Sequence, residues 1–158
     1  AGTAFPISTG TAVTFGIWNV SSAYNAVPLW FRASYTSGTI ALGTWGLSDQ
    51  YCGFALGTGA PLTAFTNGTP KNALLSSGRA SAMRFTPSAA TLGTGGTAFM
   101  WFGAGQESAT AGLGIWGVKE DFDGSIIVPP GHLLFVCASV AQTGLFSMSM
   151  AWSEVPIV

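Results

Sequence analysis

Ionised side chains are scarce in this chain of 158 residues. Lys, Arg, Asp and Glu together make up 7% of it, against about 25% in an average soluble domain. Hydrophobic residues make up 48%, so Ser, Thr, Asn, Gln and Gly must supply nearly all of the polar surface. Surfaces with so little charge repel one another weakly, which favours association. We therefore expect much of the surface to be buried in an oligomer or a larger assembly.

The basic residues form no cluster. The net charge is −1, and the cations are well separated along the chain, as Arg32, Lys71, Arg79, Arg84 and Lys119. A nucleic-acid-binding surface needs a dense group of cations to neutralise phosphates, so we expect no nucleic-acid partner. Gly, Ser, Thr and Pro interrupt every long apolar stretch. No segment is therefore expected to cross a membrane as a helix.

Groups for acid–base or metal chemistry are equally few. The single histidine is His132, and catalysis by a histidine needs a nucleophile and an orienting carboxylate that the sequence does not place beside it. A zinc site needs three or four His, Cys or carboxylate ligands, and no clustered set occurs. We therefore expect a structural His132, and no catalytic residue, cofactor or metal.

One acidic segment deserves a separate interpretation. The spacing Asp121-x-Asp123-Gly124 offers oxygen ligands to calcium. Few other carboxylates are close in sequence, and Lys119 is adjacent, so the segment favours a solvated loop in which Asp and Gly stabilise a turn.

The two cysteines, Cys52 and Cys137, lie far apart in the sequence and have apolar neighbours. Such residues behave as small hydrophobic side chains. We expect two thiols that are buried separately, with one disulfide as the alternative.

Glycine, in contrast, is plentiful. The 22 glycines separate short β-branched and aromatic runs, a pattern that is typical of many short strands joined by tight turns. The predicted strands are 11–18, 29–35, 39–45, 51–56, 62–66, 72–75, 80–86, 97–103, 113–118, 125–128, 132–140 and 145–154. This number of strands predicts an all-β, antiparallel sandwich or jelly roll.

The last two strands give the clearest pattern. In 145–154, the apolar residues Phe146, Met148, Met150 and Trp152 alternate with small residues, so one face of this strand should fill the core. The strand 132–140 is apolar almost throughout and should be covered on both faces. Two prolines and a glycine at 129–131 should stop strand pairing before it.

No linker or repeat divides the chain, so residues 10–158 are predicted to form one domain. Residues 1–9 contain Phe5, Pro6 and Ile7 and little else that indicates structure. We expect these three residues to form an assembly contact in an arm that reaches a neighbouring subunit or capsid. A frayed terminus is the alternative.

The chain has six tryptophans, and two interpretations are open. Exposed tryptophans stack on sugars, which would indicate carbohydrate binding. Buried tryptophans instead fill cores and subunit interfaces. The shortage of charge favours the second interpretation.

The C-terminal third of the chain resembles a group of small virion proteins of tailed bacteriophages. The resemblance depends on the segment 124–131 (Gly-Ser-Ile-Ile-Val-Pro-Pro-Gly), on the apolar strand after it and on 152–156 (Trp-Ser-Glu-Val-Pro). The segment 67–75 (Asn-Gly-Thr-Pro-Lys-Asn-Ala-Leu-Leu) is similar to the same proteins.

The resemblance implies a jelly-roll-like β-sandwich that forms a homotrimer on the virion surface. The implied role is capsid decoration, or cement, with the major capsid protein or another virion protein as the partner. A head-fibre or tail-associated module that binds a host receptor or glycan is the alternative. The resemblance brings no catalytic residues with it.

Overall fold

The structure is a computed structural model that describes residues 12–38, 43–57, 60–73, 78–87, 90–93, 95–105, 117–140 and 144–158. These residues form strands, turns and irregular segments, and none of them is helical. The strands are β1 (Ala12–Val13), β2 (Gly16–Trp18), β3 (Tyr24–Ser37), β4 (Gly43–Tyr51), β5 (Leu62–Phe65), β6 (Arg84–Thr86), β7 (Ala90–Leu92), β8 (Thr97–Gly105), β9 (Gly117–Asp121), β10 (His132–Ala138) and β11 (Leu145–Pro156).

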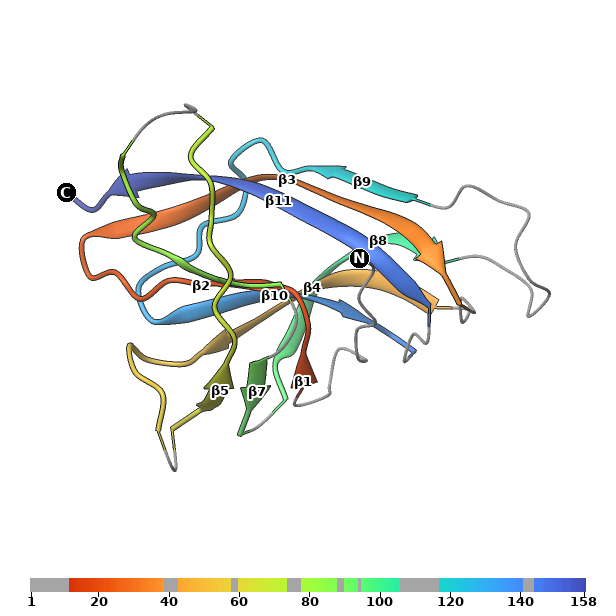
Figure 1. The fold of residues 1–158 in the computed structure, drawn as a ribbon, viewed down its shortest axis with the longest axis horizontal. Coiled ribbons are helices and arrows are strands. Elements are labelled where there is room, and N and C mark those ends of the chain that lie inside the picture. The colour runs from red at the N-terminus through yellow and green to blue at the C-terminus, as the bar shows by residue number, and fades with distance from the viewer. Residues whose placement is uncertain are drawn as a thin grey trace.

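The strands form three antiparallel sheets (Figure 1). We call them the upper sheet (β11-β3-β9), the central sheet (β6-β2-β10-β4-β8) and the lower sheet (β1-β7-β5). Each name follows the position of the sheet in Figure 1. All pairings between neighbouring strands are antiparallel. The prediction of an all-β, antiparallel chain is therefore confirmed.

Strand β10 lies in the middle of the central sheet, between β2 and β4. Its side chains alternate between two cores, because successive side chains of a strand point to opposite faces of the sheet. They are Leu134, Val136 and Ala138 in the upper core, and Leu133, Phe135 and Cys137 in the lower core. A strand that is covered on both faces has no solvent-facing positions, which explains the unbroken apolar sequence of 133–138 and confirms the prediction for these residues. Residues 139 and 140 of the predicted strand lie beyond the end of β10 and are exposed.

The upper core lies between the upper and central sheets. Phe146 of β11 is fully buried there, and its ring meets that of Trp45 at 4.7 Å between centroids, edge to face. Met148, Met150 and Trp152 pack against the same core and are half-buried. The alternation that was predicted for the last strand is thus confirmed, and its apolar face points inward.

The corner at 129–131 ends one pairing and starts another. Val128 makes a single bridge to Ala26, and strand pairing resumes at His132. Gly131 has a φ of 81°, and a Cβ there would lie 2.6 Å from Cε2 of Tyr51. Only glycine therefore fits this position without strain. The prediction that pairing stops at this corner is confirmed.

Several predicted strands are wrong or differ in length. The predicted strand 51–56 is wrong beyond Tyr51, the last residue of β4, because Gly53 adopts a left-handed conformation with a φ of 68°. Residues 125–127 follow a left-handed pair at Asp123 and Gly124 and do not form a strand. In the predicted strand 80–86, only 84–86 pairs, as β6.

Other boundaries also changed. The predicted strand 11–18 is divided into β1 and β2. Strand β7 was not predicted, because its three residues are too few to show alternation. Residues 72 and 73 are not in a strand. The parts of the predictions at 39–42, 74–75 and 113–116 lie outside the described residues.

Candidate functional site

His132 is paired with a carboxylate. Its Nδ1 lies 3.0 Å from both Oδ1 and Oδ2 of Asp49, and its ring meets that of Tyr51 edge to face at 5.3 Å. The register of β10 on β4 brings these residues together, since His132 faces Tyr51 and Leu134 faces Asp49. The sequence did not indicate this carboxylate. Among the described residues no hydroxyl or thiol donates a hydrogen bond to the pair. The pair therefore stabilises the start of β10, and it has no nucleophile to activate.

The acidic segment is partly a strand. Strand β9 continues to Asp121, so the expected loop was wrong for residues 120 and 121. The Asp121 carboxylate accepts a hydrogen bond of 2.8 Å from Nη2 of Arg32 and lies 3.4 Å from Nζ of Lys119. Chiefly the Arg32 hydrogen bond lowers the pKa of this carboxyl group below its usual value. The expected turn at Asp123 and Gly124 is confirmed, with φ values of 49° and 78°.

Metal-ligating side chains do not gather in the part of the chain that the structure describes. No group of three or more His, Cys, Asp or Glu residues there has the proximity to hold an ion. The carboxylate of Asp121 is engaged by two cations instead.

Both cysteines are free, buried thiols in the lower core. Burial raises the pKa of Cys52 to about 12 and that of Cys137 to about 12. The expectation of two separately buried thiols is confirmed. Protonated thiols are poor nucleophiles and poor metal ligands, so neither residue is suited to chemistry.

The tryptophans take different positions. Trp18 and Trp45 are fully buried, as expected for core residues. Trp101 of β8 is 45% exposed, and Trp116 lies outside the described residues. The other two, Trp30 of β3 and Trp152 of the edge strand β11, are half-buried.

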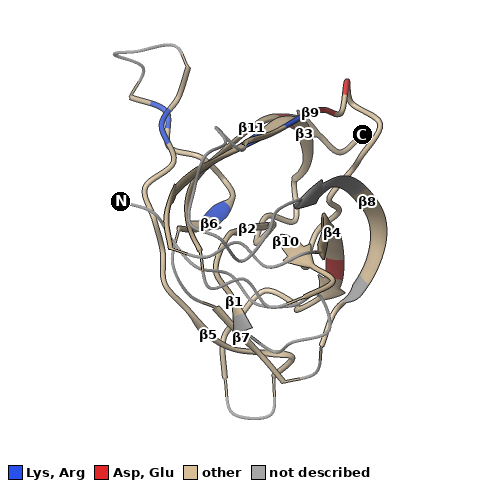
Figure 2. Ribbon diagram, turned by 90° about the vertical axis from the view of Figure 1, so that its right-hand side faces the viewer, with Lys and Arg blue, Asp and Glu red and all other residues tan. Residues whose placement is uncertain are grey.

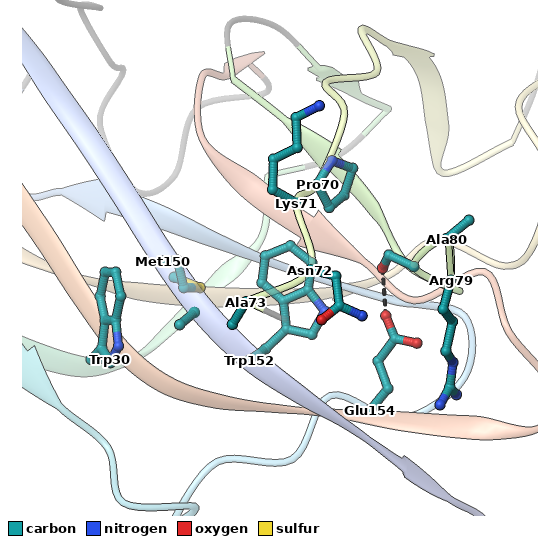
Figure 3. A pocket seen from close by; sticks show the side chains of 12 residues that line it. Trp30, Pro70, Lys71, Asn72, Ala73, Arg79, Ala80, Met150, Trp152 and Glu154 are labelled. Atoms are coloured by element: carbon teal, nitrogen blue, oxygen red, sulfur yellow. Dashed lines mark hydrogen bonds between the residues drawn. The ribbon is translucent and has the colours of Figure 1, made fainter. Parts of the chain in front are cut away.

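Trp30 and Trp152 line a groove of about 480 Å³ (Figure 3). Strands β3 and β11 supply one wall, with Met150 between the two indoles in the view of Figure 3. Residues 70–73 and 79–81 supply the opposite wall. The segments 67–75 and 152–156 both contribute to this groove, although 80 residues separate Asn72 from Trp152 in the sequence.

Glu154 holds the two walls together. Its carboxylate accepts hydrogen bonds from the Ser81 hydroxyl and from the backbone N–H of Ala82, the latter at 3.1 Å to each oxygen. Two protein donors therefore satisfy the Glu154 carboxylate. The sequence carried a signal for this residue, because Glu154 continues the period-two series of Met150 and Trp152 on the inner face of β11. A carboxylate on an apolar face needs a specific partner.

Two cations stand at the exposed wall of the groove. Lys71 and Arg79 line it together with Asn72, and all three residues are exposed. The guanidinium of Arg32 lies over the Trp30 ring at 5.0 Å from its centroid, which fixes the indole in place. The groove thus combines flat apolar rings with hydrogen-bonding and cationic groups. The sequence did not predict it, because its walls come from distant segments.

A second surface has the opposite character. Residues 50–70 and 85–106 contain no Asp, Glu, Lys or Arg, and they supply β5, β7 and β8. Figure 2 accordingly shows no charged residue on the lower sheet. Large apolar side chains are exposed in these stretches, with exposed fractions of 39% to 51%: Phe54, Leu56, Phe99 and Trp101.

The predicted arm contact is not tested by the fold. Phe5, Pro6 and Ile7 lie outside the described residues. The described residues also include no helix with the length and apolar character needed to cross a membrane.

The chain was also compared with known proteins. No family model matches it, and neither a curated protein nor a solved structure does.

Proposed function

We propose that this protein is a structural component of a tailed-bacteriophage virion, with capsid decoration, or cement, as its role. In this proposal it binds the major capsid protein or another virion protein and performs no catalysis. The chain acts as a homotrimer, and its all-β body is a variant of the jelly-roll sandwich.

The uncharged stretches that supply β5 and β7 of the lower sheet and β8, an edge strand of the central sheet, are the observation that carries the proposal. Phe99 and Trp101 are 51% and 45% exposed on β8, and no ionised side chain lies within residues 85–106. Exposed apolar side chains on stretches that carry no charge of their own favour burial against another protein. Burying these side chains desolvates no charge within those stretches, which limits the cost of association.

Two further arguments support an assembly role. The resemblance of segments 124–131 and 152–156 to small virion proteins favours the phage particle as the site. Multivalency favours a trimer, because a three-fold oligomer on a capsid engages several subunits at once and gains avidity without new contacts.

Solution mass tests the oligomer. Light scattering during size-exclusion chromatography should give the mass of three chains of 16.2 kDa each. The double variant Phe99→Ser/Trp101→Ser should shift the protein toward monomer. The matched control is Leu29→Ser/Ile127→Ser, which removes two exposed apolar residues that lie outside the uncharged stretches. A monomeric wild-type chain, or equal behaviour of the two variants, would contradict the proposal for this surface.

Purified particles test the location. Quantitative mass spectrometry of virion peptides should find the chain in a fixed ratio to the major capsid protein, at a copy number comparable to it. Its absence from particles would overturn the virion role.

The groove favours a second candidate, a head-fibre or tail-associated module that binds a host receptor or glycan. Copy number separates the two candidates. A fibre or tail component should occur in far fewer copies than the major capsid protein.

A further inference from the structure

We propose that the groove between β11 and residues 70–73 and 79–81 binds a short acidic saccharide. The inference depends on the groove alone, which is independent of the uncharged surface. Its failure would therefore leave the assembly proposal standing.

The size and lining of the groove suit such a ligand. Its volume of about 480 Å³ falls within the range of about 300–1,000 Å³ for small-molecule sites. Those sites are mainly apolar and carry a few polar groups that orient the ligand. Here Trp30, Met150 and Trp152 give the apolar part, and Asn72 adds an amide that both donates and accepts hydrogen bonds.

The two indoles favour a sugar ring over other small molecules. A pyranose has flat patches of C–H groups and a rim of hydroxyls, so it stacks on an aromatic face while its rim bonds to polar side chains. The Arg32 guanidinium lies over one face of the Trp30 ring, 5.0 Å from its centroid, so the sugar is expected to stack on the other face. A ring that is already ordered loses little entropy on binding.

The charges of the groove favour an acidic sugar. Lys71, Arg79 and Glu154 are the ionised groups that line the groove, so its formal charge is positive. The Arg79 guanidinium lies over the Tyr24 ring at 5.6 Å from its centroid, and the Glu154 carboxylate accepts hydrogen bonds from Ser81 and Ala82. The excess of cations stands out in a chain whose net charge is −1. A ligand carboxylate near Lys71 and Arg79 gains attraction that a neutral sugar lacks.

Isothermal titration with tri-galacturonate is the test, with maltotriose as the neutral counterpart. Wild-type protein should bind tri-galacturonate more tightly than maltotriose, and added salt should weaken the binding because salt screens the exposed cations. The variant Trp30→Ala should weaken it by about tenfold. Trp30 is not part of either buried core, so this variant should keep the fold.

Two further variants complete the design. Lys71→Gln, at an exposed position, should reduce the affinity for tri-galacturonate and leave any affinity for maltotriose unchanged. Ile127→Ala is the control, because it removes an exposed apolar side chain that lies outside both the groove and the uncharged stretches, and it should leave binding unchanged.

The opposite outcomes are equally definite. Absence of binding to tri-galacturonate at millimolar concentration would overturn the inference. So would equal affinity for maltotriose, equal losses in Trp30→Ala and Ile127→Ala, or tighter binding of a glutamate-rich peptide than of tri-galacturonate.

Discussion

The two cores on either side of β10 are built differently. Above the central sheet, the covering strands β3 and β11 are 14 and 12 residues long. Below it, β1, β7 and β5 have two, three and four residues. Long paired strands bury a continuous face by themselves, whereas short strands pair over too few residues to be stable alone. The upper half, which is the upper sheet and the upper core, therefore covers its apolar residues without a further partner.

The surfaces of the two halves also differ, in the number of ionised side chains that they carry. The groove, its cations and the Arg32–Asp121 pair belong to the upper half. The lower half has no ionised side chain in residues 50–70 and exposes Phe54 and Leu56. A core that is covered only by short strands and lies beneath an uncharged surface is stabilised most when a protein partner buries that surface. Under the two proposals, the groove of the upper half binds the saccharide and the uncharged stretches make the assembly contact.

The largest expected effect comes from two neighbouring leucines of β10. Leu134 is buried in the upper core and Leu133 in the lower core. Leu134→Ala should lower the free energy of unfolding by about 4 kcal/mol, because the long strands around it cannot close the cavity. Leu133→Ala should cost about 2–3 kcal/mol, since short strands can shift into the space.

Urea unfolding at one fixed protein concentration measures both values. The two variants serve as controls for each other, because they remove the same atoms from adjacent residues of one strand. A larger loss for Leu133→Ala would reverse the comparison and make the lower core the more rigid one.

The second effect depends on pH and belongs to the lower core alone. Cys52 and Cys137 have a pKa of about 12 in the folded protein, against 9.0 for an ordinary thiol. Below pH 9 both states hold the protons, so these thiols do not change stability. Above pH 9 the unfolded chain ionises first, and the free energy of unfolding should fall by up to about 1.4 kcal/mol per pH unit for each thiol.

Urea midpoints at pH 8 and pH 10 check this slope. The double variant Cys52→Ala/Cys137→Ala should lose most of the decrease, whatever its stability at pH 8. An equal decrease in the wild type and in the double variant would show that other groups cause it.

The sequence predicted the fold best where the residue pattern of a single strand indicates which of its faces are buried. The alternation of Phe146, Met148 and Met150 predicted the inward face of β11, and the unbroken apolar run of β10 predicted cover on both faces. The number of sheets did not follow from these patterns. A strand that is covered on both faces has the same kind of unbroken apolar pattern in two places, in the middle of a parallel sheet and between two layers of antiparallel strands.

The candidate sites were less predictable, for a physical reason. Lys71 and Trp152 line one groove only because the chain returns to the edge of β11, and Asp49 meets His132 only through the register of β4 on β10. Such contacts depend on long-range pairing, which single-sequence patterns do not encode. Composition, in contrast, is a property of the whole chain, so the scarcity of charge was visible without the fold.

The third effect concerns the corner where β10 begins. Gly131→Ala must place a Cβ 2.6 Å from Cε2 of Tyr51 at a φ of 81°, so it should cost about 2 kcal/mol. Gly53→Ala is the matched control, because Gly53 also has a positive φ, of 68°, but has no atom within 4 Å of the new Cβ. It should cost only the backbone strain, about 1 kcal/mol.

Urea unfolding separates the two contributions. The difference between the variants reports the contact with Tyr51, and therefore how firmly the corner fixes the start of the strand that both cores share. Equal losses would mean that Tyr51 moves aside at no cost.

The smallest effect tests whether the groove wall is held to the upper half by Glu154. The Ser81 hydroxyl donates to the Glu154 carboxylate and accepts a hydrogen bond of 3.0 Å from the Met83 N–H. Ser81→Ala removes both bonds and should cost about 1 kcal/mol, with faster amide exchange confined to residues 79–83. Ser153→Ala is the control, since Ser153 is exposed on the opposite face of β11, next to Glu154, and should leave exchange unchanged. Faster exchange across β10 as well would show that this wall supports the cores themselves, and the two halves would then not be independent.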